Sequence, residues 1–188
     1  MSRIAVIGAG AWGTGLAIVL GRGGRHQVRL WAHEKEVRDS ILARHENELF
    51  LPGLSIPPTI LPTGSLQEAL ESAEIVVSVM PSQHCRSLFQ QMFPYLKPEI
   101  LFVSATKGLE EDTLLRMTEV AAQVIQLRCG FAPRIGALSG PSFAKEVARG
   151  DPTAITVASK DSALADTVQR EFSDSRFRIY TNDDVVGV

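Results

Sequence analysis

The first fourteen residues hold the pattern that most constrains the fold of this chain. A run rich in β-branched residues ends at Gly8, and Gly8, Gly10 and Gly13 then follow the spacing G-x-G-x-x-G. An apolar stretch typical of a helix comes directly afterwards. In such a unit the first glycine permits a tight turn, the second lets a pyrophosphate approach the backbone, and the third lets the helix pack closely on the strand. Because the motif lies between a strand and a helix, it indicates dinucleotide binding rather than a structural turn that only matches the spacing.

Length and composition narrow the class of protein. The chain has 188 residues, which suits one domain with a full core. A hydrophobic content of 45% and a charged content of 21% are typical of a soluble globular protein. The formal net charge is -2, and lysine and arginine do not cluster, so we expect no nucleic-acid partner.

The chain also lacks the signals of secreted and membrane proteins. Cys85 and Cys129 stand apart with no paired spacing, so we expect reduced thiols rather than a disulfide framework. No apolar run approaches the ~20 residues that span a bilayer, and we expect no membrane span. The N-terminus enters a strand at Arg3, which leaves no room for a signal peptide. We therefore expect a cytoplasmic location.

Strand-like and helix-like segments alternate along the chain. Strands are expected over Arg3–Ile7, Gln27–Trp31, Thr59–Leu61, Ile75–Met80, Ile100–Ser104, Arg134–Leu138, Thr153–Ala158 and Phe177–Tyr180. Helices are expected over Trp12–Arg22, Lys35–Arg44, a short segment capped by Ser65, Ser82–Met92, a long segment from Asp112 to Leu127, and Ser162–Phe172. The segment Asn47–Thr63, with four prolines, should otherwise be a loop. The alternation predicts an α/β fold of the Rossmann type, a doubly wound and mainly parallel sheet with helices on both faces.

Sheets of this kind bind ligands beyond the carboxyl ends of their strands. Trp12 lies in the glycine loop, where its ring could pack between helix and sheet or form a wall of the pyrophosphate site. An acidic residue about 20 positions after the glycines commonly binds the adenosine ribose, and Glu34 lies 21 positions after Gly13. His33 occupies the more typical position, and it could contact the cofactor or simply begin an exposed helix. These residues leave open whether the cofactor is NAD or NADP.

Two further strand ends carry candidate residues. Lys107 follows the strand that ends at Ser104, and a lysine there would point into the cleft, where a fixed cation suits a phosphate or a developing oxyanion. The alternative is a surface lysine before a glycine turn. Pro141 and Ser142 follow a later strand and predict a helix start whose N–H groups offer a second anion site. The four histidines lack metal-ligand spacing, so no metal site is expected.

Five motifs in this order resemble those of the NAD(P)-dependent sn-glycerol-3-phosphate dehydrogenase family, bacterial type. The resemblance covers the full length of the chain, with one mild departure at Gly15, where the family often has alanine and where glycine should weaken the helix by up to ~1 kcal/mol. The motifs are Gly8-Ala-Gly-Ala-Trp-Gly-Thr14, Leu30-Trp-Ala-His33, Phe50-Leu-Pro-Gly53, Ala105-Thr-Lys-Gly-Leu-Glu110 and Ser139-Gly-Pro-Ser-Phe-Ala-Lys-Glu146.

The resemblance implies reversible hydride transfer between dihydroxyacetone phosphate and glycerol 3-phosphate, which feeds phospholipid synthesis. NAD or NADP would be the cofactor, a small phosphorylated molecule the substrate, and the intact enzyme could form a homo-oligomer. The implied cofactor-binding residues are Gly8, Gly10, Ala11, Trp12, Gly13, His33, Lys107 and Ala144. The implied substrate-binding residues are Lys107, Gly140 and Ser142.

The family also has a second, helical domain at its C-terminal end, which carries the proton-transferring lysine. That lysine is expected beyond Val188, so residues 1–188 should form a dinucleotide-binding domain without a catalytic residue. We expect this chain alone to bind cofactor but not to catalyse efficiently, because proximity and acid catalysis both require the second domain. The alternatives are a two-domain dehydrogenase of the 6-phosphogluconate or 3-hydroxyacyl-CoA type, and a stand-alone NAD(P)-binding or redox-sensing module.

Overall fold

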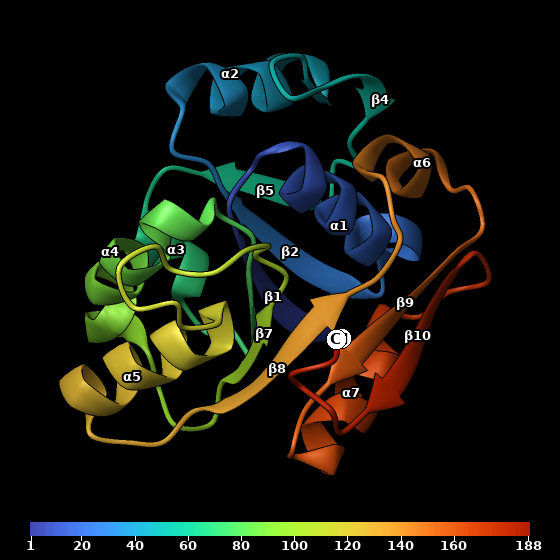
Figure 1. Cartoon of the computed structure of the whole chain (residues 1–188). Helices are drawn as coiled ribbons and strands as arrows, with labels where there is room; N and C mark the ends of the chain where they lie inside the picture. Colours follow the sequence, from blue (N-terminus) through green and yellow to red (C-terminus); the bar gives the residue numbers. More distant parts are fainter.

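A computed structural model describes all of residues 1–188 and centres on an eight-stranded sheet (Figure 1). The strand order is β10-β9-β8-β7-β6-β1-β2-β5. All neighbouring strands are parallel except β8 and β9, so the expected mainly parallel sheet is confirmed. The strands are β1 (Ser2–Ile7), β2 (His26–Trp31), β5 (Ile60–Thr63), β6 (Ile75–Ser78), β7 (Leu101–Ser104), β8 (Arg134–Ser139), β9 (Thr153–Ala158) and β10 (Phe177–Asn182).

Helices cover both faces of this sheet, as the alternation predicts (Figure 1). One face packs against α1 (Ala11–Gly21), α6 (Ala144–Arg149) and α7 (Ser162–Phe172), and the same core extends to α2 (Lys35–Arg44). The other face packs against α3 (Leu66–Leu70), α4 (Ser82–Met92) and α5 (Met117–Cys129). No helix of the chain has both the length and the apolar character needed to cross a membrane.

Alternation of side chains along the central strands builds the two cores. Ile4 and Val6 of β1 lie in the core under α1, whereas Ala5 and Ile7 point to the core under α4 and α5. Every residue of β6 is buried. A strand covered on both faces needs apolar side chains at every position, which explains the continuous hydrophobic run from Ile75.

The expected helix from Asp112 is wrong in its start. Helix α5 begins at Met117, and Asp112 lies in an exposed turn of the loop that joins β7 to α5. The cap is instead at Arg116, whose backbone N–H donates to Glu119 Oε2 at 2.9 Å. A bridge between Leu109 and Arg116 closes the loop before the helix starts, so the residues after Asp112 are not available to a helix.

Two other segments differ from the expectation. The region expected as loop after Asn47 contains a two-stranded antiparallel hairpin, β3 (Glu46–Asn47) and β4 (Leu51–Ser55), before β5 joins the main sheet. Pro141 and Ser142 precede a helix but do not begin it, because α6 starts at Ala144 with Phe143 as its N-cap.

Candidate cofactor-binding site

The glycine loop joins β1 to α1, and its three glycines meet three different surroundings. Gly8 has a φ of +123°, and a Cβ there would lie 2.3 Å from the carbonyl oxygen of Val79. A Cβ at Gly13 would lie 1.8 Å from the carbonyl oxygen of Gly8, so the helix could not approach the turn. A Cβ at Gly10 would meet nothing within 4 Å. The fold therefore requires glycine at the first and third positions, whereas the second faces open space.

Helix α1 begins beside that open space without any side-chain cap. Its N-cap is Gly10, no side chain accepts a hydrogen bond from the first turn, and no acidic residue lies in that turn. The first N–H groups of a helix have no partner within the helix and carry partial positive charge. They are therefore free to bind an anion placed next to Gly10.

A buried asparagine, Asn47, hydrogen-bonds to the glycine loop. Sequence reasoning did not identify it. Asn47 of β3 is fully buried, and its Nδ2 donates to the carbonyl oxygen of Ala9 and to Thr14 Oγ1, both at 2.8 Å. Its Oδ1 accepts from the backbone N–H of Phe50 at 3.1 Å. Thr14 Oγ1 also donates to the carbonyl oxygen of Ala9, at 3.2 Å. One side chain thus ties the hairpin to both the loop and the first turn of α1.

A cavity of about 390 Å³ opens beside the loop, within the usual range of small-molecule sites. It lies at the carboxyl ends of β1, β2 and β6, between the glycine loop and α4. Of the expected cofactor residues, Gly8, Gly10 and His33 line it. The other lining residues are Ala9, Trp31, Glu34, Phe50, Val79, Met80, Pro81, His84, Ser87, Leu88 and Gln91.

The aromatic residues near the cavity occupy two different settings. Trp12 is half-buried and packs against the core of the α1 face, and its indole Nε1 is buried without a hydrogen-bond partner. Of the two alternatives for Trp12, the structure shows the packing, and the residue does not line the cavity. His33 is exposed at the cavity, with its ring centroid 6.0 Å from that of Trp31. Arg38 Nη1 donates to the carbonyl oxygen of His33 at 2.9 Å and fixes the backbone there.

Lys107 reaches the next strand end. Its Nζ lies 3.5 Å from Ser139 Oγ, so the ends of β7 and β8 meet through these side chains. Ser142 follows on the same loop as Ser139, and its Oγ donates to the carbonyl oxygen of Gly140 at 3.4 Å. Lys107, Gly140 and Ser142 therefore gather at adjoining strand ends, although none of them lines the cavity of the glycine loop.

An ion pair anchors the loop that carries Lys107. Arg86 of α4 makes two hydrogen bonds of 2.7 Å to the carboxylate of Glu110. The Oγ1 of Thr113 donates to the same carboxylate at 2.5 Å. The guanidinium of Arg86 is the main reason that the pKa of Glu110 falls to about 2. The bidentate pair fixes the loop to the helix that lines the cavity.

Helix α6 packs across α1 close to the glycine loop. A Cβ at Gly15 would lie 3.1 Å from the carbonyl oxygen of Ala144, the first residue of α6. The glycine at position 15 thus permits close contact of the two helices, a compensation for its low helix propensity. Gly140 is packed as tightly, because a Cβ there would lie 2.9 Å from Ile155 Cγ2.

Other chemistries find little support in the arrangement. Histidine, cysteine, aspartate and glutamate nowhere form a group of three that could hold a metal ion. Both cysteines are free thiols, and burial raises the pKa of Cys85 to about 12. A thiol with that pKa is not a nucleophile at neutral pH.

Sequence reasoning missed the part of the site that α4 contributes. His84, Ser87 and Gln91 line the cavity from consecutive turns of that helix. The sequence does contain their spacings of three and four residues, which place the side chains on one face of a helix. The spacing alone does not indicate which face of a helix looks onto a cavity, so the residues carried no separate signal.

Comparisons with known proteins agree with this geometry. A family model described as NAD-dependent glycerol-3-phosphate dehydrogenase N-terminus matches residues 3–165. Glycerol-3-phosphate dehydrogenase [NAD(P)+] of Koribacter versatilis is 68% identical, over all of this chain and 55% of the relative. The Geobacter sulfurreducens enzyme of the same name is 47% identical over 99% of this chain and 55% of its own length. The chain therefore spans about half the length of the curated relatives it matches.

Solved structures give the same result. The crystal structure of glycerol-3-phosphate dehydrogenase from Coxiella burnetii superposes with a TM-score of 0.90 at 35% identity, over 99% of this chain and 55% of that one. The yeast enzyme, at 23% identity and a TM-score of 0.84, shares the fold. The Rossmann-type fold and the family resemblance are both confirmed. The chain belongs to the family of NAD-dependent glycerol-3-phosphate dehydrogenase N-termini.

Proposed function

We propose that residues 1–188 are the dinucleotide-binding domain of an NAD(P)-dependent glycerol-3-phosphate dehydrogenase acting in the cytoplasm. The whole protein would transfer hydride reversibly between NAD(P)H and dihydroxyacetone phosphate, giving sn-glycerol 3-phosphate for phospholipid synthesis. The family assignment favours this activity over that of the other two-domain dehydrogenases with a similar plan.

One observation carries the proposal, namely the open space at Gly10. The protein itself gives no reason for glycine at this position, since a Cβ there would meet no atom within 4 Å. A bound pyrophosphate supplies the reason, because it must approach the backbone within hydrogen-bond distance, ~2.9 Å. The uncapped N–H groups of α1 are the donors that such a group would use.

The cofactor supplies the hydride, and residues of this chain bind and orient it. Gly8, Gly10 and the first turn of α1 would hold the pyrophosphate. His33 and Glu34, at the end of β2, would contact the adenosine ribose at the exposed end of the cavity. Met80 gives the cavity an apolar corner, which suits an uncharged ring.

Lys107 is the proposed link between cofactor and substrate. Its ammonium lies beside Ser139 on the neighbouring strand end, where a phosphate or a carbonyl oxygen could accept from both. Gly140 and Ser142 follow directly and would complete the substrate end. The Arg86–Glu110 pair holds the loop that carries Lys107, so the backbone at Lys107 is in place before substrate binds.

We propose no proton donor among residues 1–188, because the proton-transferring lysine of the family is expected beyond Val188. On this proposal the chain binds the dinucleotide and the substrate phosphate, while efficient turnover needs the second, helical domain. A stand-alone NAD(P)-binding or redox-sensing module remains the second candidate, and it predicts dinucleotide binding without substrate binding.

Fluorescence separates these two candidates. Trp12 and Trp31 are the two tryptophans, and both lie close to the glycine loop, so bound NADH should accept their excitation energy. Dihydroxyacetone phosphate, added to the NADH complex, should change this signal. Lys107→Ala should weaken that second response about tenfold, the loss of one charge-assisted hydrogen bond. Lys160→Ala, an exposed lysine elsewhere, is the control.

The fluorescence responses distinguish the two candidate functions as follows. Sensitised NADH emission with a substrate response that depends on Lys107 supports the dehydrogenase domain. Emission with no substrate response favours the binding module. Equal substrate affinities in Lys107→Ala and Lys160→Ala would overturn the role given to Lys107.

A further inference from the structure

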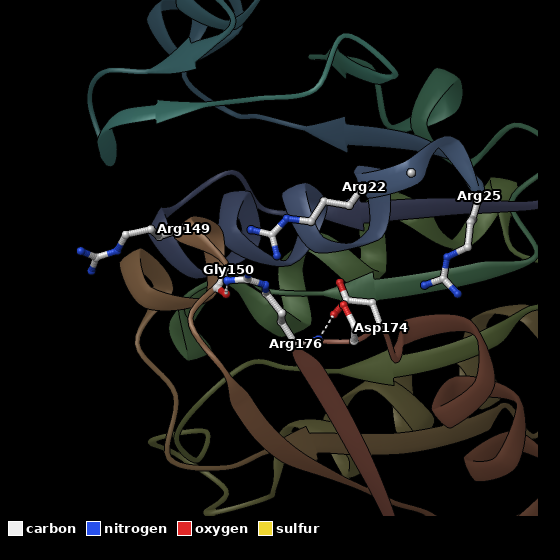
Figure 2. A pocket seen from close by; sticks show the side chains of 8 residues that line it. Arg22, Arg25, Arg149, Gly150, Asp174 and Arg176 are labelled. Carbon is white, nitrogen blue, oxygen red and sulfur yellow. Dashed lines mark hydrogen bonds between the residues drawn. The ribbon is translucent and has the colours of Figure 1, made fainter.

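A second cavity, of about 410 Å³, lies apart from the cofactor cavity and shares no residue with it (Figure 2). It opens between the turn that ends α1, the C-terminal end of α6 and the loop that joins α7 to β10. None of its eight lining residues is hydrophobic, and four are arginines, against a single aspartate. A cavity of this composition has an excess of positive charge that the proposed function does not use.

Two of these arginines are fixed by backbone carbonyl groups. Arg22 Nη2 donates to the carbonyl oxygen of Val147 at 3.0 Å and also to that of Ala148, both in the last turn of α6. Arg176 Nη1 donates to the carbonyl oxygen of Gly150 at 3.2 Å. Figure 2 shows both side chains ending close to Gly150. Each guanidinium has five N–H donors, so most of them stay free.

Arg25 completes the group from the end of the α1 turn. Its Nη2 donates to the carbonyl oxygen of Ser173 at 2.9 Å, and its side chain extends toward Asp174 in Figure 2. Arg149 points away from the others in the same view and pairs with Asp151 at 3.3 Å. Arg22, Arg25 and Arg176 are therefore the lining arginines that do not form such a pair.

None of these three arginines pairs with a carboxylate. Their acceptors are neutral carbonyl oxygens, which orient a guanidinium without cancelling its charge. The aspartate of the cavity, Asp174, uses Oδ1 to accept from the backbone N–H groups of Arg176 and Phe177, both at 2.7 Å. It shapes the loop that carries Arg176 and offsets only one of the positive charges.

Capping of α6 accounts for part of this arrangement. Arginine at a helix C-terminus satisfies free carbonyl groups and the negative end of the helix dipole, which explains the contacts of Arg22. Arg25 and Arg176 cap helices in the same way, because their acceptors, Ser173 and Gly150, are the C-cap residues of α7 and α6. Capping does not by itself explain why three guanidinium groups line one polar cavity. Like charges repel, and an anion between them would remove that repulsion.

We propose that this cavity is a binding site for a small polyvalent phosphate compound. The planar forks of Arg22, Arg25 and Arg176 match phosphate oxygens, to which arginine donates in pairs. The wholly polar lining favours a soluble metabolite with one or two phosphate groups over an apolar ligand. Helix α6 begins at Ala144, an expected cofactor contact, and ends at this cavity, so one helix connects the two sites.

Calorimetric titration with pyrophosphate tests the site. The 188-residue chain carries Gly10→Val in every sample, so that the glycine loop does not take up the probe. Pyrophosphate should bind, and Arg25→Gln and Arg176→Gln should each weaken its binding at least tenfold. Arg178→Gln is the charge-matched control, an exposed arginine of β10 that does not line the cavity, and it should leave the affinity unchanged.

A second measurement does not depend on the variants. Backbone amide NMR shifts, followed during the pyrophosphate titration, should change most in residues 22–25, 149–151 and 174–176. Absence of binding, equal affinities in the three arginine variants, or shifts centred on another surface would each overturn the proposal. Arg25→Lys keeps the charge but not the fork, and we expect it to bind more weakly than the parent.

Discussion

Asn47 should control both the stability of the fold and the shape of the glycine loop. Its side chain makes three hydrogen bonds in a fully buried position, to Ala9, Thr14 and Phe50. Asn47→Ala removes all three and leaves a small void. Each hydrogen bond contributes about 1 kcal/mol, and the void adds to the loss, so the free energy of unfolding should fall by roughly 3–4 kcal/mol.

Thermal unfolding and NADH titration measure the two effects. In a domain of this size 1 kcal/mol corresponds to about 2–4 °C, so the melting temperature should drop by roughly 6–15 °C. The affinity for NADH should fall as well, because the backbone of Ala9 in the glycine loop would lose its hydrogen bond from Asn47. Asn182→Ala, an exposed asparagine of β10, is the control and should melt like the parent. Equal melting temperatures for Asn47→Ala and Asn182→Ala would refute the reasoning.

Three further changes probe single features. Gly13→Ala should lower the free energy of unfolding by about 3 kcal/mol or more, because its Cβ would lie 1.8 Å from the carbonyl oxygen of Gly8. A melting temperature like that of the parent would contradict this close approach. The Glu110 carboxyl, whose pKa falls from its ordinary 4.5 to about 2, stabilises the fold above pH 4.5, and this contribution is lost as the pH falls toward 2. In urea unfolding at pH 5, the free energy of unfolding of Arg86→Ala should therefore be about 1–2 kcal/mol lower than that of the parent. This difference should shrink by pH 3, and a difference that stays constant would argue against the ion pair. Asp161→Ala should cost about 1–2 kcal/mol in the same assay, because the carboxylate caps α7, and no change would exclude a role for the cap.

Hydrophobic periodicity was sufficient to predict the sheet and most of its helices. The run from Ile75 is apolar at every position because β6 is covered on both faces, and such a pattern is visible in the sequence. The start of α5 was not predictable in this way. Asp112 has the character of a cap, but the bridge between Leu109 and Arg116 is a tertiary contact that moves the start to Met117.

The residues of the site also fall into those that local sequence predicts and those that depend on tertiary contacts. The glycine loop was identifiable from sequence, because each glycine has a local role at a fixed spacing. The place of Lys107 at the edge of the sheet was predictable because the residue follows a strand. The role of Asn47 depends on a hairpin that folds back beneath the loop, which no local pattern indicates. The contribution of α4 depends in turn on which of its faces meets the cavity.

The central claim is that the glycine loop binds the dinucleotide. Calorimetric titration of the parent and of Gly10→Val, with NADH and with NADPH, tests it most directly. The account predicts that the parent binds at least one dinucleotide. It predicts at least about 100-fold weaker binding in Gly10→Val, from the loss of two charge-assisted hydrogen bonds of about 1.5–3 kcal/mol each. The melting temperature should fall by only about 2–4 °C, since the added side chain meets no protein atom near its Cβ and the loss is that of glycine as the N-cap of α1. Equal affinities in the two proteins, or no binding to the parent, would contradict the assignment of the glycine loop as the cofactor site.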